Sequence, residues 1–136
     1  MKNNKLPIGY YLKKADNLLT EGINNIFKAL DINRLKWQIL HSLTDNKRID
    51  RSAMASSLGP FADEEQIKLS IADLIERGLV QQIGDTDIKL TNKGEEFHQL
   101  CFQKQKAFRL KATEGLSQEA YFKTIETLEK IISNLE

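Results

Sequence analysis

The chain has 136 residues, 40% of them hydrophobic and 29% charged, which is typical of one soluble globular domain and excludes a disordered chain. Its net charge of +1 does not by itself indicate a nucleic-acid binder, and its single cysteine, Cys101, excludes an internal disulfide and disfavours a cysteine-based zinc site. No apolar run is long enough to span a membrane, and the basic N-terminus leads into an amphipathic stretch rather than a secretory signal, so a cytoplasmic protein is expected.

The first expected element is a long amphipathic helix over residues 8–30. Its apolar residues recur at spacings of three and four, and Pro7 suits the first turn of a helix. This apolar stripe is longer than a small core can cover, so we expect part of it to face a second subunit. The N-terminal lysines would add a long-range positive field or keep a dimer soluble; they are Lys2, Lys5, Lys13 and Lys14.

Three shorter helices are expected next, each behind a capping residue. Asn33 would cap a helix that places Trp37 in the core, and Asp50 would cap a second over residues 51–58 that ends at Gly59-Pro60. Asp63 would cap a third, up to Arg77, with Gly78 in the left-handed conformation behind it. The inward residues are expected to be Ala53, Met54 and Leu58 in the second helix and Ile67, Ile71, Leu74 and Ile75 in the third.

A hairpin and two helices complete the chain. Two apolar runs, residues 79–83 and 88–90, flank the turn Gly84-Asp85-Thr86-Asp87 and predict a β-hairpin. Thr91 would cap a long helix to about Ala112, and Ser117 a last helix over residues 118–135. No repeat and no long linker divides the chain, so a single domain over residues 1–136 is expected. Short helices at a sharp turn followed by a hairpin indicate a winged helix-turn-helix.

Five stretches, in this order and over nearly the whole chain, resemble the MarR family of bacterial winged-helix regulators: "DINRLKWQILHSL", "IDRSAMASSL", "IADLIERGLV", "IKLTNKGEEF" and "GLSQEAYFKTIETLEKI". The resemblance implies a mainly α fold with a small β-hairpin, in which residues 32–91 form the DNA-binding winged helix. It implies that residues 6–30 and 92–136 form dimerisation helices, and that the helix at 63–77 reads the major groove of a palindromic operator. It also implies a cleft for a small-molecule effector. Tyr11, Trp37 or Phe102 could line this cleft, but the sequence shows no set of polar residues that would converge on a ligand there.

The candidate DNA-binding residues divide into base-reading and backbone-contacting sets. On the expected reading helix, Gln66 can bond an adenine edge, Lys68 a guanine or a phosphate, and Glu65 a cytosine amine. The acidic first turn that contains Glu65 would equally offset the helix dipole. The backbone-contacting candidates are Lys47, Arg48, Arg51, Thr86 and Lys89. The wing turn lacks the arginine that wings of this family often send into the minor groove, so a weak grip is expected there.

No pattern indicates catalysis, a cofactor or a metal. His41 and His98 lie far apart in sequence, outside any metal-ligand spacing, and Cys101 is expected to be a buried structural thiol. Two hypotheses about function remain. The first is a homodimeric transcriptional regulator that binds double-stranded DNA. The second is a winged-helix protein-interaction module that has lost sequence-specific DNA binding, suggested by the net charge of −1 over residues 47–93 against +4 over residues 1–36.

Overall fold

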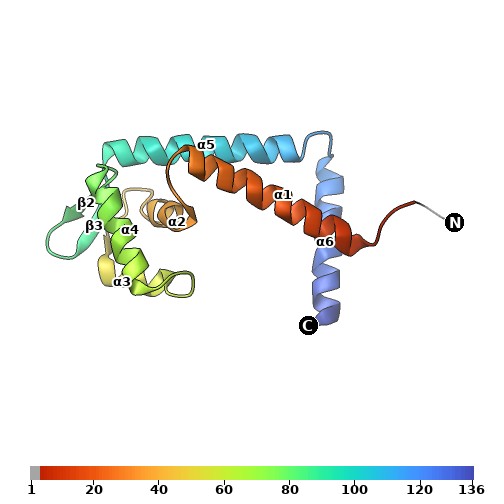
Figure 1. The fold of residues 1–136 in the computed structure, drawn as a ribbon, viewed down its shortest axis with the longest axis horizontal. Helices are drawn as coiled ribbons and strands as arrows, with labels where there is room; N and C mark the ends of the chain where they lie inside the picture. Colours follow the sequence, from red (N-terminus) through yellow and green to blue (C-terminus); the bar gives the residue numbers. More distant parts are fainter. Residues whose placement is uncertain (1–3) are drawn as a thin grey trace.

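The computed structural model describes residues 4–136, which form six helices and a small sheet (Figure 1). In chain order the elements are α1 (Ile8–Ala29), α2 (Arg34–Ser42), β1 (Ile49–Asp50), α3 (Arg51–Leu58), α4 (Glu64–Glu76), β2 (Val80–Ile83), β3 (Asp87–Leu90), α5 (Asn92–Ala112) and α6 (Gln118–Leu135). Every expected helix and the hairpin are confirmed, and the mainly helical winged-helix class is confirmed with them. No helix over residues 4–136 combines the length and apolar character needed to cross a bilayer. The expectation about Lys2 lies outside the described residues.

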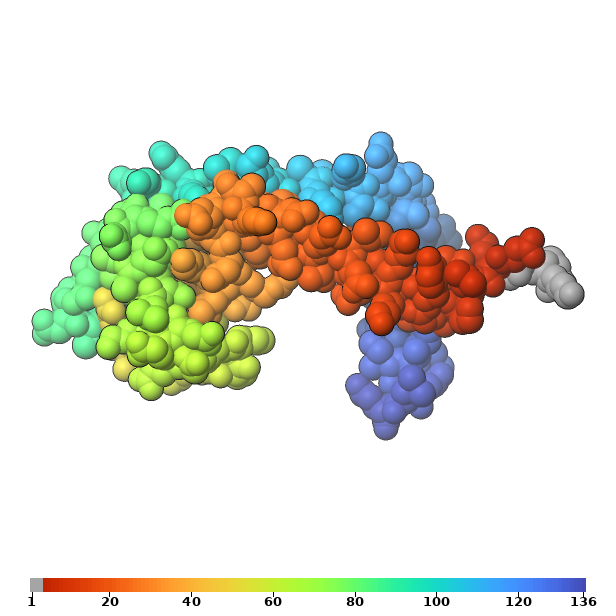
Figure 2. Space-filling view, in the orientation of Figure 1, coloured from red at the N-terminus to blue at the C-terminus, as the bar shows by residue number. Residues whose placement is uncertain are grey.

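The molecule is an arch with a lobe at each end. Helix α1 packs along α5, and the winged part, from α2 to β3, hangs from one end of this pair (Figure 1). At the other end the chain turns after α5, and α6 stands across α1 and α5. The space-filling view shows an open hollow between the winged part and α6 (Figure 2). The winged part is therefore held at a distance from α6 by two long helices.

Side-chain caps fix where the helices begin. The Asn33 side chain accepts from the amide of Lys36 at 2.9 Å, and Asp63 takes part in a capping box with Gln66. Such caps satisfy amides that have no partner inside the helix, at about 1 kcal/mol each. All five expected caps are confirmed: Asn33, Asp50, Asp63, Thr91 and Ser117.

The main core lies inside the winged part, between α2, α3, α4 and the sheet. Its centre is formed by buried aliphatic residues, among them Ile39, Leu40, Leu43, Met54, Ile67, Leu74 and Ile88. The expectation for α3 is corrected at Ala53, which is exposed, while its neighbour Ala55 packs against the core. The sheet has a third strand that the sequence did not predict: β1 pairs antiparallel with β3, in the order β1-β3-β2. Two residues are too few to show an alternating pattern.

A second cluster joins the winged part to the long helices. It consists of Phe27, Ile32 and Cys101, with Trp37 packed on it only partly buried rather than in the core as expected. The Cys101 side chain is fully buried, as predicted, and desolvation raises the pKa of its thiol, partly offset by a contact from Gln105. A buried thiol with a raised pKa is poorly suited to oxidant sensing, because the thiolate is the reactive form.

One glycine lets a helix begin directly against the hairpin. Gly94 lies in the first turn of α5, where an added Cβ would stand 1.9 Å from the carbonyl oxygen of Leu79. That carbonyl is fixed, because it accepts from the amide of Thr91 at 3.1 Å. A side chain at position 94 would therefore push α5 away from the winged part.

Candidate nucleic-acid interface

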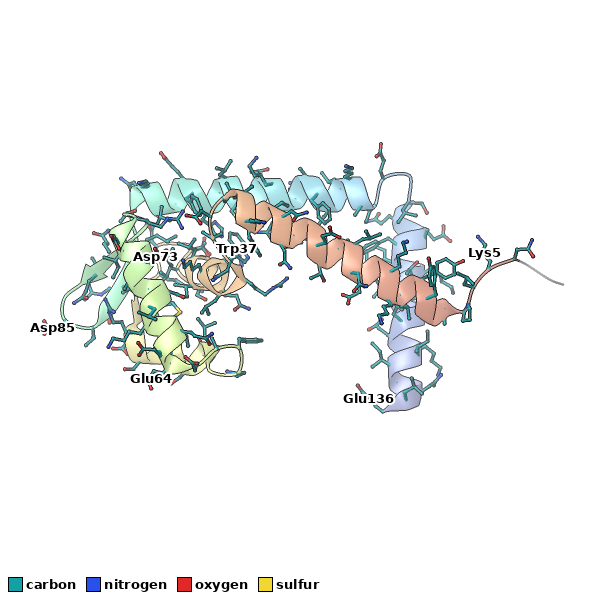
Figure 3. The ribbon with its side chains drawn as sticks, viewed as in Figure 1. Lys5, Trp37, Glu64, Asp73, Asp85 and Glu136 are labelled. Atoms are coloured by element: carbon teal, nitrogen blue, oxygen red, sulfur yellow. The ribbon has the colours of Figure 1, made fainter. Side chains whose placement is uncertain are left out.

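Helix α4 presents its polar side to solvent along one flank of the winged part. Glu64, Glu65 and Lys68 are exposed, while Ile67, Ile71 and Leu74 face the core as expected. Glu64 lies at the free end of this helix, far from α5 (Figure 3). Base-reading side chains of helix-turn-helix proteins lie near this end. The position of α4 therefore suits insertion into a groove, although Leu69, also exposed, adds an apolar side chain to the same surface.

Gln66 is less available for base reading than its sequence position indicates. Its side-chain Oε1 accepts from the amide of Asp63 at 3.1 Å, while the Asp63 carboxylate accepts from the amide of Gln66 at 2.8 Å. Bidentate recognition of adenine needs both the oxygen and the nitrogen of the amide. With Oε1 engaged in the capping box, only the Nε2 group of Gln66 remains free to donate.

Asp73, on α4, is half-buried in an ion-pair network. Its Oδ2 lies 2.9 Å from Nζ of Lys36 on α2 and 3.8 Å from Nη1 of Arg77. Arg77 in turn donates to the carbonyls of Asp31, at 2.7 Å, and of Leu30, at 3.3 Å. The network fastens α4 to α2 and to the end of α1. It also engages the ammonium group of Lys36.

The cationic candidates of the winged part come from both sides of β1. Lys47 and Arg48 are exposed in the turn before β1, and Arg51 is the first residue of α3. Arg51 and Lys68 line one groove between α3 and α4, together with Glu64. A phosphate seated at this groove would meet two cations, one from each helix of the turn motif.

The wing turn is braced by those same arginines. Nε of Arg48 donates to Oδ2 of Asp87 at 2.6 Å, and Nη2 of Arg51 donates to Oε1 of Gln82 at 2.8 Å. The Arg51 amide also donates to the carbonyl of Thr86 at 2.9 Å. Asp85 stands at the outer tip of the hairpin (Figure 3). The other two residues predicted to contact the DNA backbone also lie in the wing. Thr86 is exposed in the turn, and Lys89 is half-buried on β3.

Not all the acidic side chains of residues 47–93 are free to repel DNA, because several have structural partners. Asp50 caps α3, and the amide of Ala53, the Thr86 side chain and the amide of Ser52 hold the pKa of Asp50 below its ordinary value. Four of the eight acids have structural partners, namely Asp50, Asp63, Asp73 and Asp87. The net charge of residues 47–93 counts all eight acids equally, because a sum over the sequence does not include their structural partners.

Two histidines that are far apart in sequence meet where α2 packs on α5. Nδ1 of His41 lies 3.0 Å from Nε2 of His98, and one ring nitrogen must donate to the other. Trp37 stacks on both rings, with centroids 4.7 Å from His98 and 5.3 Å from His41, and Phe102 stacks on His98 with the centroids 6.3 Å apart. No local pattern in the sequence predicts this contact, which links the winged part to the long helices.

We expect this histidine pair to make stability fall in mild acid. Burial, followed by the nearby His41, lowers the pKa of His98, against the opposing effect of Asp45. Near pH 6.5 the unfolded chain therefore binds a proton at this position that folded His98 does not. The contribution of His98 to the free energy of unfolding is complete above about pH 6.5. It is lost as the pH falls through the lower pKa of the folded state. The midpoint of urea unfolding should then fall more between pH 7.5 and 5.5 in the wild type than in His98→Phe. Parallel pH curves for the two proteins would contradict this prediction.

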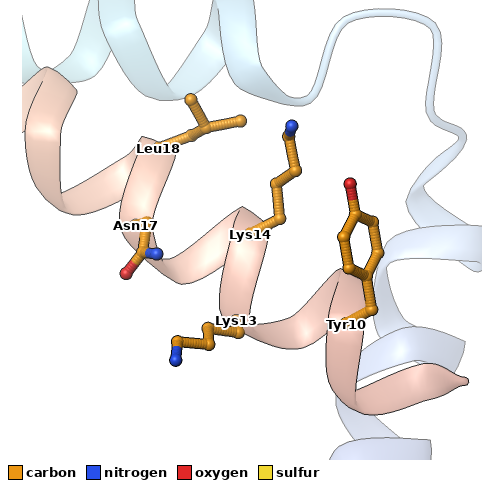
Figure 4. A pocket seen from close by; sticks show the side chains of 5 residues that line it. All are labelled: Tyr10, Lys13, Lys14, Asn17 and Leu18. Carbon is orange, nitrogen blue, oxygen red and sulfur yellow. The ribbon is translucent and has the colours of Figure 1, made fainter.

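The three aromatic candidates for lining an effector cleft do not come together at one place in the fold. Trp37 and Phe102 each stack on His98, whereas the hydroxyl of Tyr11 on α1 accepts from the amide of Leu6, which precedes α1. A surface pocket is lined by α1 residues alone, Tyr10, Lys13, Lys14, Asn17 and Leu18, with Lys14 and Tyr10 pointing the same way (Figure 4). A small-molecule effector stays a prediction.

Comparison with known proteins finds similar solved structures but no matching sequence family. No protein-family model matches the chain, and no curated protein matches it. Among solved structures, wild-type MarR from E. coli in its apo form superposes with a TM-score of 0.70 at 18% identity, covering 95% of this chain and 98% of that one. The chain has the fold of MarR.

Two further structures share the MarR fold with this chain. The YusO protein from Bacillus subtilis superposes with a TM-score of 0.79 at 15% identity, covering 93% of this chain and 92% of its own. A mutant of S. aureus MepR bound to an oligodeoxyribonucleotide superposes with a TM-score of 0.72 at 16% identity, over 97% of this chain and all of MepR. At such identities the shared property is the MarR fold itself, including the long helices on both sides of the winged part.

Proposed function

We propose that the protein is a homodimeric transcriptional regulator that binds double-stranded DNA, with α4 in the major groove. The observation that carries this proposal is the exposed polar flank of α4, next to a groove that Arg51 and Lys68 line together. The fold is shared with a MepR mutant that was solved bound to an oligodeoxyribonucleotide. Cations on both helices of the turn motif are what phosphate contact requires.

The dimer is supported by apolar surface that this chain leaves uncovered. No residue of α6 is buried, although α6 carries an apolar stripe. The exposed apolar residues on α1 and α6 include Ile8, Leu12, Leu18, Leu19, Phe122, Ile125 and Ile132. An exposed apolar area of this extent is typical of an interaction surface, and a second copy supplies the complementary stripe. We therefore assign residues 6–30 and 92–136 to dimerisation and residues 32–91 to DNA binding.

The proposed contacts divide by chemistry. Lys47, Arg48 and Arg51 would bind the backbone, and Lys68 would bind backbone or a guanine edge. Glu65 and the free Nε2 group of Gln66 would face bases. Thr86 and Lys89 would approach the backbone from the wing.

Replacing Lys68 with alanine should weaken DNA binding uniformly across sequences. A phosphate-contacting lysine contributes counterion release, so the slope of log affinity against log salt should become shallower by about 1. Fluorescence anisotropy with duplex probes at several salt concentrations measures both quantities. Lys130→Ala is the matched control, because it removes the same charge from α6, away from α4. Wild-type protein that binds no duplex from its own upstream region at low salt would contradict the proposed function.

A protein-interaction module is the second candidate, and two exposed apolar side chains favour it. Phe61 is 69% exposed before α4 and Leu69 is 60% exposed on it, next to the acidic side chains of Glu64 and Glu65. Exposed apolar side chains beside acidic ones suit a basic amphipathic partner better than they suit phosphates. Selection of bound fragments from genomic DNA separates the candidates, because an interaction module would enrich no sequence.

A further inference from the structure

The arginine that the wing turn lacks is supplied by another segment. Arg48, which comes before β1, places its guanidinium beside the turn, where Nε donates to Oδ2 of Asp87 at 2.6 Å. The nearest atom to a Cβ added at Gly84 would be Nη2 of Arg48, at 3.6 Å. The Arg48 side chain is nevertheless 54% exposed. A cation therefore lies at the wing turn although the turn sequence contains none.

Backbone pairing holds this cation in place. In the antiparallel β1–β3 pair, Ile49 lies opposite Ile88 and Asp50 opposite Asp87. On the other side of β1, the amide of Arg51 donates to the carbonyl of Thr86. Arg48 is thus followed directly by a strand that is bonded to the wing. Its position relative to the turn is set by the sheet and not by a flexible loop alone.

The hydrogen bond to Asp87 leaves the outer part of the guanidinium available. A guanidinium carries five N–H donors, and one of them, on Nε, is used by Asp87. Neither Nη group of Arg48 has a hydrogen-bond partner within residues 4–136. Two Nη groups in a fixed plane match the oxygens of a phosphate bidentately. Ordering the side chain before binding also reduces the entropy lost when the contact forms.

We propose that Arg48, held by Asp87, contacts a phosphate at the wing turn, and that Asp87 is a positioning residue for it. This inference rests on the proposed function. Asp87 aids DNA binding through Arg48, although its own charge repels phosphates. Asp85, at the tip, has no hydrogen bond or ion pair to its carboxylate in the described part of the chain. Asp85 only repels the phosphates.

The test compares the same change of charge at two positions in one turn. Asp85→Asn and Asp87→Asn each remove one negative charge, and binding to a duplex of mixed sequence is measured by anisotropy over a salt series. Asp85→Asn should bind about twofold more tightly, because a repulsion is removed. Asp87→Asn should bind about threefold more weakly, because Arg48 loses its anchor. Arg48→Ala should bind about fivefold more weakly, with a salt slope shallower by about 1.

The double variant separates positioning from a general effect on the fold. Without the Arg48 side chain, Asp87 can only repel DNA, so Arg48→Ala with Asp87→Asn should bind more tightly than Arg48→Ala alone. A structural role of Asp87 would weaken binding in both backgrounds. Asp87→Asn that binds more tightly than the wild type, as Asp85→Asn does, would overturn this inference and leave the proposed function standing. Wild-type protein that binds no duplex at low salt would overturn both.

Discussion

Replacing Gly94 with alanine should lower the free energy of unfolding by about 3 kcal/mol, the upper range for forcing an extra carbon into a packed site. The new Cβ would stand 1.9 Å from the carbonyl oxygen and 2.9 Å from the carbonyl carbon of Leu79. Backbone atoms cannot rotate aside as a side chain can. Thr91 holds this junction further, because its hydroxyl donates to the carbonyl of Gly78 at 2.6 Å and accepts from the amide of Gly94 at 2.9 Å.

Urea unfolding at one fixed protein concentration measures the effect of Gly94→Ala. The control is Gly9→Ala in α1, where an added Cβ meets nothing within 4 Å. That change should be neutral or stabilising by up to about 1 kcal/mol, since alanine favours a helix more than glycine does. Equal stability of Gly94→Ala and the wild type would show that α5 can shift relative to the hairpin without cost.

Placing a carboxylate in the middle of the α6 stripe should dissociate the dimer. Ile125 is 40% exposed in this single chain, and in the proposed dimer the partner's apolar stripe covers it. Burying an unpaired carboxylate costs several kcal/mol. Ile125→Glu should therefore weaken dimerisation about a hundredfold or more. Sedimentation equilibrium should show a monomer at micromolar concentrations at which the wild type is a dimer.

Thr127→Glu is the matched control for Ile125→Glu. It introduces the same carboxylate two residues later on the same helix, which at 100° per residue is nearly the opposite side of α6. The one hydrogen bond of the Thr127 side chain within the described residues is from its hydroxyl to the carbonyl of Lys123 at 2.9 Å. Thr127→Glu should leave the dimer intact. A dimer that survives Ile125→Glu would show that α6 does not form the interface.

Local chemistry made most of the fold predictable. A helix start depends on one oxygen and one amide three residues apart, so Asn33, Asp63 and Thr91 could be assigned as caps from their own neighbourhoods. The inward side of α4 followed from its spacing of apolar residues in the same way. The predicted inward position of Ala53 was wrong, because α3 is short and its small residues do not distinguish an inward from an outward position.

The parts of the site that were not predicted depend on contacts between distant positions. His41 and His98 are 57 residues apart, and Arg48 and Asp87 are 39 apart. Neither pair forms a local pattern, and both require the relative placement of elements that only packing provides. Asp87 shows the consequence most clearly: in the sequence it is a negative charge on a wing, and in the fold it is the acceptor that orients a guanidinium.

The stack on His98 gives the protein an internal optical probe. Trp37 is the only tryptophan of the chain, and its ring lies 4.7 Å from that of His98 at an interplanar angle of 5°. Indole emission is sensitive to a neighbouring imidazole and quenched more by its protonated form. The fluorescence of the unlabelled protein therefore reports on one place, the contact between α2 and α5. Any change in how the winged part sits on the long helices should be visible there without a dye.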